Sequence, residues 1–116
     1  MSLKKKPAKR ARRAVPIRTS YLVTIGCSTG FCEPDPNPLT VHENDYVTFT
    51  ADGTHVIVKF TTSPFVSGHK QFDIPAGVTT PQETVKPQAS KPKHLKYKVT
   101  CDDCASVQDP PEMIVE

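Results

Sequence analysis

The sequence predicts an all-β sandwich of about seven short strands, preceded by a disordered basic arm. Twelve prolines argue against long helices, because proline lacks an N–H and clashes with the preceding helical turn. The apolar residues are mostly Val, Ile, Phe and Tyr in short runs, which is typical of strands. A chain of 116 residues holds one domain at most. Its core would be small, so a cross-link or a bound metal would matter for its stability.

The first 18 residues differ in charge from the rest of the chain. They contain eight of the fifteen basic residues and no acidic residue, whereas the remainder has seven basic and twelve acidic residues. Blocks of like charge repel one another, stay disordered and bind polyanions by counterion release. We therefore expect a flexible arm over residues 1–18 and a folded domain over residues 19–116. The residues expected to contact nucleic acid or another polyanion, without sequence preference, are Lys4, Lys5, Lys6, Lys9, Arg10, Arg12 and Arg13. The alternative role for the arm is a solubilising extension.

The sequence favours a cytoplasmic location. It has no apolar run long enough to span a membrane, and the apolar stretch at residues 14–17 is too short for a secretory signal. The alternative is an exported protein whose leader is missing. In a reducing cytosol, four cysteines are expected to be metal ligands or redox thiols and not structural disulfides.

The first strand is predicted over residues 21–26, YLVTIG. Cys27 and Cys32 follow in a C-x4-C loop, in which Gly30 supplies backbone freedom. Residues 33–38 have proline at alternate positions. This spacing predicts a stiff extended connector or an edge, because proline cannot donate to a sheet ladder.

The middle of the chain is predicted to form strands around tight turns. Segments 39–42 and 46–51 flank a turn at residues 43–45. The dipeptide Asp52-Gly53 is a strong hairpin signal and leads into a strand over residues 54–60. In the loop that follows, Phe65 is expected to close the end of the core.

The C-terminal part is expected to contain three strands and one partly extended segment, at residues 71–74, 79–84 (partly extended), 95–101 and 112–115. Alternation of apolar and polar residues places Tyr97, Val99 and Cys101 on the inward face. Cys104 follows three residues after Cys101, so their sulfurs can meet.

Several strings of the sequence resemble the cupredoxin-like proteins, the plastocyanin type of sandwich. They are LTVHENDYVTFT from Leu39, DGTH ending at His55, SPF at residues 63–65, the Tyr97-x-Val-x-Cys101 strand, and DPPEMIV from Asp109. The likeness covers residues 21–116 and implies a Greek-key sandwich in which the two cysteine-bearing loops lie at the same end.

The resemblance also implies a degenerate type 1 copper site. His55 stands where the family has its first histidine ligand, and Cys101 where it has its cysteine. Cys104 occupies the place of the second histidine, and Met113 lies within the last strand and not near residue 109, where the axial methionine is expected. A blue-copper site needs two imidazoles and one thiolate, so electron transfer by this route is not expected.

The resemblance implies that the four cysteines converge, and several chemistries suit them. Two short-spaced pairs of thiolates suit tetrahedral zinc in a closed structural site, formed by Cys27, Cys32, Cys101 and Cys104, with His55 as a further candidate ligand. Disulfides are the alternative, and sequence cannot choose among their three pairings. The third possibility is copper handling or thiol redox chemistry through His55, Cys101 and Cys104, although Asp102 and Asp103 would raise the thiol pKa.

No pattern in the sequence indicates an enzyme. It contains no glycine-rich phosphate loop and no nucleophile with an identifiable base. The sequence therefore predicts a non-catalytic binding module with a structural, zinc-like cysteine cluster and a basic tail for binding polyanions or for tethering. The alternative is a copper-handling or thiol-redox protein of cupredoxin type.

Overall fold

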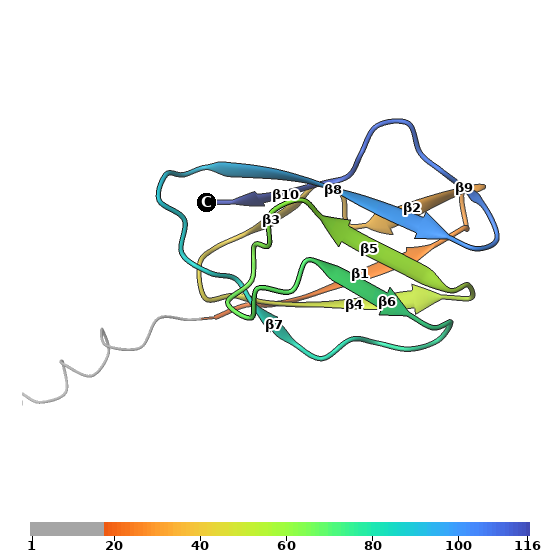
Figure 1. Ribbon diagram of the computed structural model, residues 1–116, viewed down its shortest axis with the longest axis horizontal. Helices are drawn as coiled ribbons and strands as arrows, with labels where there is room; N and C mark the ends of the chain where they lie inside the picture. Colours follow the sequence, from red (N-terminus) through yellow and green to blue (C-terminus); the bar gives the residue numbers. More distant parts are fainter. Residues whose placement is uncertain (1–17) are drawn as a thin grey trace, which may run out of the picture.

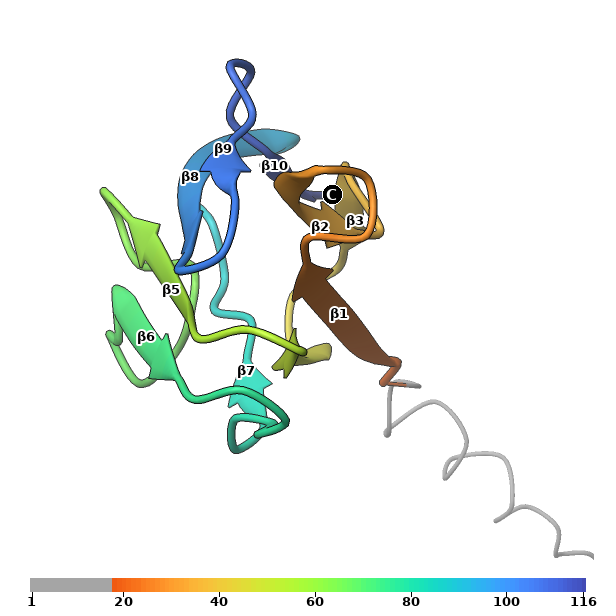
Figure 2. The ribbon, with the colours of Figure 1, turned by 90° about the vertical axis from the view of Figure 1, so that its right-hand side faces the viewer.

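The computed structural model describes residues 18–116, which form two β-sheets packed face to face (Figures 1 and 2). No helix occurs among these residues, so the all-β prediction is confirmed. The described part has ten strands, more than the seven or so predicted, because residues 31–35, 83–84 and 105–106 also pair. Apart from Arg18, the predicted arm lies outside the described residues.

The first sheet has the strand order β7-β4-β1-β2-β9. Its strands are β1 (Ser20–Gly26), β2 (Phe31–Asp35), β4 (Tyr46–Asp52), β7 (Glu83–Thr84) and β9 (Ala105–Ser106). β1 runs parallel to β4 and antiparallel to β2. At the end of β1, Gly26 lies so close to β4 that an added Cβ would be 2.8 Å from the Asp52 carbonyl oxygen, which explains the glycine at this position.

The second sheet has the strand order β3-β10-β8-β5-β6. Its strands are β3 (Leu39–Val41), β5 (Val56–Phe60), β6 (Gln71–Ile74), β8 (Lys93–Cys101) and β10 (Glu112–Val115). β8 is central and pairs antiparallel with both β5 and β10.

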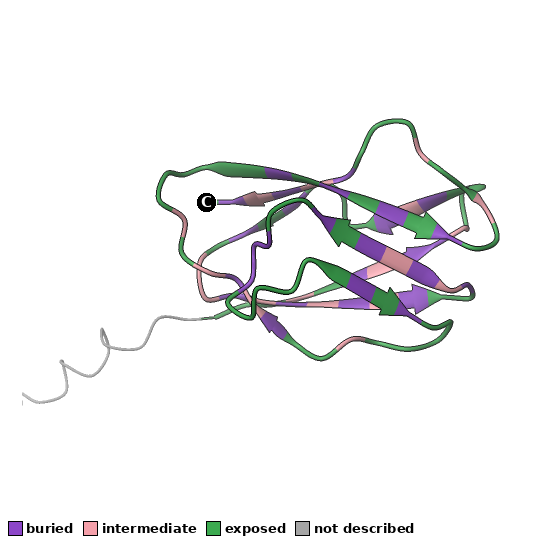
Figure 3. Cartoon of the chain, viewed as in Figure 1, coloured by how far each residue is buried: buried purple, intermediate pink, exposed green. Residues whose placement is uncertain are grey.

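The inward faces follow the predicted alternation of apolar residues. In Figure 3, purple marks buried residues. Purple and green segments alternate along β8, and purple segments alternate with one pink and one green segment along β5. On β4 the buried residues are Val47, Phe49 and Ala51. Phe65 is fully buried, and its ring centroid lies 6.3 Å from that of Phe49. The expectation that Phe65 closes the core is therefore confirmed.

The two tight turns of the middle segment do not form hairpins. β3 belongs to the second sheet, β4 to the first and β5 to the second, so the chain crosses between the sheets at both turns. Asn44 (φ 73°) and Gly53 (φ 75°) adopt the left-handed conformation that such turns require. The hairpin prediction at Asp52-Gly53 was wrong, because this dipeptide specifies a sharp turn but not the sheet in which the next strand pairs.

Candidate functional site: the cysteine cluster and its surroundings

The four cysteines meet at one end of the sandwich. Cys27 directly follows β1, Cys32 lies in β2, Cys101 ends β8 and Cys104 directly precedes β9. Disulfides join Cys27 to Cys104 and Cys32 to Cys101, with Cα–Cα distances of 6.0 and 5.5 Å. The predicted convergence of the two loops is therefore present, and each disulfide links the C-x4-C segment to the C-x2-C segment.

The predicted closed zinc site requires four thiolates, and the structure contains disulfides instead. Zinc binds the thiolate form of cysteine, and a sulfur in a disulfide is not a thiolate. The structure thus corresponds to the disulfide alternative. The Sγ atoms of Cys27, Cys101 and Cys104 nevertheless all lie within 4.8 Å of one another, so the two disulfides are neighbours.

The two disulfides differ in burial. Cys32 is fully buried and Cys101 is 5% exposed, whereas Cys27 and Cys104 are half-buried at the edge of the core. β9 adds to the link between the loops by pairing Phe31 with Ala105 and Cys32 with Ser106. A reductant in solution therefore has easier access to Cys27–Cys104 than to Cys32–Cys101.

His55 lies beside the cysteine cluster, but both nitrogens of its ring contact carboxylate oxygens. Its Nδ1 is 3.2 Å from Oδ1 of Asp102, and its Nε2 contacts Oδ1 of Asp73. The Asp102 N–H also donates to the His55 carbonyl oxygen at 3.1 Å. The Asp73 carboxylate, and after it the Asp102 carboxylate, raise the pKa of the His55 imidazole, because a nearby negative charge favours the protonated ring.

This geometry does not place the imidazole of His55 among the sulfurs. His55 does not belong to the group of ligand atoms within 4.8 Å of one another. Sequence reasoning missed Asp73 as its partner. The sequence does place Asp73 at an outward position of a predicted strand. Only the pairing of β5 with β6 shows that this strand lies beside His55.

The other three histidines also contact carboxylates. His42, His69 and His94 are exposed, and their Nδ1 atoms lie 3.8, 3.0 and 3.1 Å from carboxylate oxygens of Asp45, Glu83 and Glu112. Asp45 is buried, and it accepts hydrogen bonds from the N–H groups of Thr19 and His42. The two hydrogen bonds to Asp45 hold the turn after β3 and the chain just before β1 in place.

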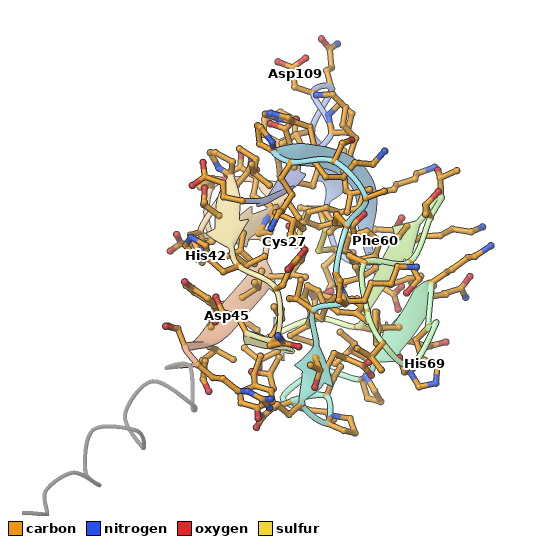
Figure 4. All side chains as sticks on the ribbon, turned by 90° about the vertical axis from the view of Figure 1, so that its left-hand side faces the viewer. Cys27, His42, Asp45, Phe60, His69 and Asp109 are labelled. Carbon is orange, nitrogen blue, oxygen red and sulfur yellow. A yellow bond between two sulfur atoms is a disulfide. The ribbon has the colours of Figure 1, made fainter. Side chains whose placement is uncertain are left out.

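An acidic cleft of about 710 Å³ lies beside the cysteine loops. Its carboxylates come from Glu33, Asp35, Asp52 and Asp109, and no basic residue lines it. Asp109 is at the tip of the loop between β9 and β10 that projects at the top of Figure 4. This end of the sandwich would repel an anionic ligand.

The basic residues predicted to bind polyanions, Lys4 to Arg13, lie outside the described residues. Within residues 18–116, no helix is long and apolar enough to cross a membrane. No protein-family model matches the chain, and no curated protein matches it. The resemblance to cupredoxin-like proteins therefore remains a prediction from the quoted strings.

Proposed function

We propose that this protein is a non-catalytic β-sandwich binding module that is cross-linked by two disulfides and binds polyanions through its basic arm. The observation that carries the proposal is the separation of charge along the chain. Eight basic residues and no acidic residue precede a domain with seven basic and twelve acidic residues. A polyanion would be attracted to the arm and repelled by the acidic cleft, which favours binding at a distance from the cysteine end.

The disulfides support an oxidising compartment. Disulfides form and persist mainly in exported proteins, whereas cytosolic thiols are kept reduced. Both pairs have Cα–Cα distances in the ordinary range for a disulfide. We therefore propose an exported location in place of the cytoplasmic location that the sequence favoured.

The fold is proposed to be of cupredoxin type, without a type 1 copper site. Cys101 ends the central strand β8, where the resemblance expects the cysteine ligand. Met113 is buried in β10 and not near residue 109, where the axial methionine would lie. His55 directly precedes β5, but both of its ring nitrogens contact carboxylates. Cys101 is in a disulfide, so neither residue is free to bind copper in this state.

The test of the proposed function compares the full chain with a variant in which the arm is neutralised (K4Q, K5Q, K6Q, K9Q, R10Q, R12Q and R13Q). Affinity for fluorescently labelled polyanions, double-stranded DNA and heparin, is measured by anisotropy over a series of salt concentrations. We expect the affinity of the native chain to fall steeply with salt and that of the variant to be lower with a shallower dependence. Equal affinity of the two proteins would contradict polyanion binding by the arm.

A metal centre in the reduced protein is the second candidate, and the close approach of three sulfurs favours it. Reduction of both disulfides by a dithiol would release four thiols, three of whose sulfurs already lie within 4.8 Å of one another. Around a tetrahedral ion bound at about 2.3 Å the sulfurs are about 3.8 Å apart. The thiols would reach this separation by moving apart after the Cys27–Cys104 bond is broken. The expected result is one zinc per anaerobically reduced chain and none per oxidised chain, measured by elemental analysis after desalting. Reduced protein that retains no zinc would contradict this candidate. An intense visible absorption after addition of Cu(II) would instead support the copper-handling alternative.

A further inference from the structure

We propose that the outer face of β5 and β8 carries a binding site for the sulfate groups of a sulfated polysaccharide. The site is a shallow depression of about 350 Å³, hereafter the lysine depression. It is lined by three lysines, Lys59, Lys96 and Lys98, together with Phe60, Thr61, Tyr97 and Pro110. The backbone of the neighbouring strands β5 and β8 passes beneath these side chains, so the lysines are held on a rigid sheet and not on a loop.

The pairing of β5 with β8 concentrates positive charge at this site. Lys59 is directly opposite Lys98 in the register, and like charges at opposed positions destabilise a sheet. Lys96 lies two residues from Lys98 and therefore projects from the same face. All three lysines are exposed. An anion bound between them would relieve a repulsion that the fold itself maintains.

Two carboxylates on the strands next to β5 and β8 are already engaged by histidines. Glu112 is opposite Lys96 in β10, but its Oε2 lies 3.1 Å from Nδ1 of His94. Asp73 on β6 contacts Nε2 of His55. Within residues 18–116, none of the three lysines has a carboxylate oxygen within 4.0 Å of its ammonium group. The lysines are therefore available to an external anion.

The chemistry of the lysine depression selects among anions. Lysine ammonium groups act as compact point charges, which suits an oxyanion group bound without a fixed bidentate geometry. The two aromatic residues below the depression, Phe60 and Tyr97, are 2% and 3% exposed and stack on each other inside the core at 4.7 Å. They offer no exposed ring on which a nucleic acid base could stack. A polymer that is recognised by its charge alone, and that occurs in an oxidising compartment, fits this surface better than a single-stranded nucleic acid.

This inference rests on the proposed function, because it assigns a second contact, on the folded domain, to the same class of ligand. The arm would supply long-range attraction, and the lysine depression would supply a fixed position for one or two sulfate groups. The acidic cleft at the cysteine end would keep the polymer away from that end.

The test uses the full-length oxidised chain and a heparin hexasaccharide. Affinity is measured by calorimetry for the native protein, for the triple variant Lys59→Gln, Lys96→Gln, Lys98→Gln, and for a matched control, Lys70→Gln, Lys86→Gln, Lys93→Gln. The control removes the same charge from lysines that do not line the depression. We expect about a tenfold loss of affinity for the first variant and a clearly smaller loss for the control, since each exposed ion pair contributes modestly. Equal losses in both variants would overturn the proposal.

A second measurement separates this site from the arm. Amide chemical shifts of the ¹⁵N-labelled native chain and of the arm-neutralised variant are followed during titration with the same hexasaccharide. Shift changes on β5 and β8 in both proteins support the lysine depression, even if neutralising the arm leaves the affinity unchanged and so defeats the proposed role of the arm. Absence of shift changes on β5 and β8 would overturn the proposal. Equal or tighter binding of a single-stranded oligonucleotide at these amides would overturn the assignment to a sulfated polysaccharide.

Discussion

At the scale of single residues, Tyr97 combines deep burial with an unpaired polar group. Its side chain is 3% exposed, and its hydroxyl has no hydrogen-bond partner among the described residues. Burial raises the pKa of the phenol, because the apolar surroundings disfavour the phenolate. The ring stacks on Phe60 with an interplanar angle of 25°. The ring therefore stabilises the core by packing, whereas burial of the hydroxyl costs desolvation free energy that no hydrogen bond offsets.

We expect the substitution Tyr97→Phe to leave the free energy of unfolding unchanged or to raise it by up to about 1 kcal/mol, because it removes an unpaired buried hydroxyl and keeps the ring. Denaturant unfolding of the two proteins measures this difference. Tyr46→Phe is the control, since the Tyr46 hydroxyl accepts a hydrogen bond from Arg18 at 2.6 Å and its removal should be neutral or slightly destabilising. A loss of more than about 1 kcal/mol for Tyr97→Phe would show that this hydroxyl forms a stabilising hydrogen bond.

His55 makes stability depend on pH in a defined direction. Asp73, and then Asp102, raise the pKa of His55 above its usual value of about 6.5. Because the folded protein binds this proton more tightly than the unfolded chain does, the stabilisation is fully present below the unfolded pKa. It is lost as the pH rises through the folded pKa.

The variant His55→Gln should therefore lack this part of the pH dependence. Thermal unfolding from pH 5 to pH 9 should show that the native chain loses stability relative to the variant as the pH increases through the neutral range. Parallel curves for the two proteins across this range would contradict the assigned role of His55.

At the scale of elements, the two disulfides fix the loops that follow β1 and β8. They close loops with sequence separations of 77 and 69 residues, which gives each a similar effect on the entropy of the unfolded chain. Their burial differs, since only Cys32–Cys101 lies within the core. The inner disulfide therefore also contributes packing that the outer one does not.

Removal of the outer disulfide by Cys27→Ala with Cys104→Ala should lower the free energy of unfolding by about 3 kcal/mol. The inner disulfide already joins the same two segments, so the outer one closes a ring of only about ten residues. The matched variant Cys32→Ala with Cys101→Ala should lose more, because it also leaves a cavity in the core. Denaturant unfolding under oxidising conditions compares them. A larger loss for the outer pair than for the inner pair would contradict the difference in burial.

At the scale of the whole molecule, the two sheets are held together by a cluster of aromatic rings. Phe49 on β4 belongs to the first sheet, and its ring centroid lies 6.4 Å from that of Phe60 on β5 and 5.3 Å from that of Phe72 on β6, both in the second sheet. Phe65, in the loop between β5 and β6, completes the cluster. Phe49 is fully buried, and it is the ring that the first sheet contributes to this cluster.

We expect Phe49→Ala to lower the free energy of unfolding by about 3–5 kcal/mol, because it removes a large buried ring and leaves a cavity between the sheets. Phe31→Ala is the control, since Phe31 is 50% exposed and its loss should cost less than about 1 kcal/mol. Calorimetric unfolding of both variants gives the comparison. Similar losses in the two variants would show that Phe49 does not join the sheets as described.

The accuracy of the sequence predictions depended on the range of the interaction involved. The strand ranges of β4, β5 and β8 were predicted to within two residues, and so was the inward face of β8, because alternation with a period of two is a local property of the chain. The hairpin predicted at Asp52-Gly53 was wrong, because β4 and β5 lie in different sheets. A turn residue sets the direction of the chain but not the strand beside which the next strand pairs. The partner of His55, Asp73, was missed for the same reason.

The sequence by itself determined the all-β class, the inward-facing residues, the concentration of basic residues in the first 18 positions and the presence of four cysteines in two short-spaced pairs. Only the tertiary structure decided that Cys27 joins Cys104 and Cys32 joins Cys101, that the chain crosses between sheets at residues 44 and 53, and that Lys59 faces Lys98. The physical reason is that composition and periodicity act between near neighbours. Strand register and sulfur pairing depend on which distant segments share one buried core.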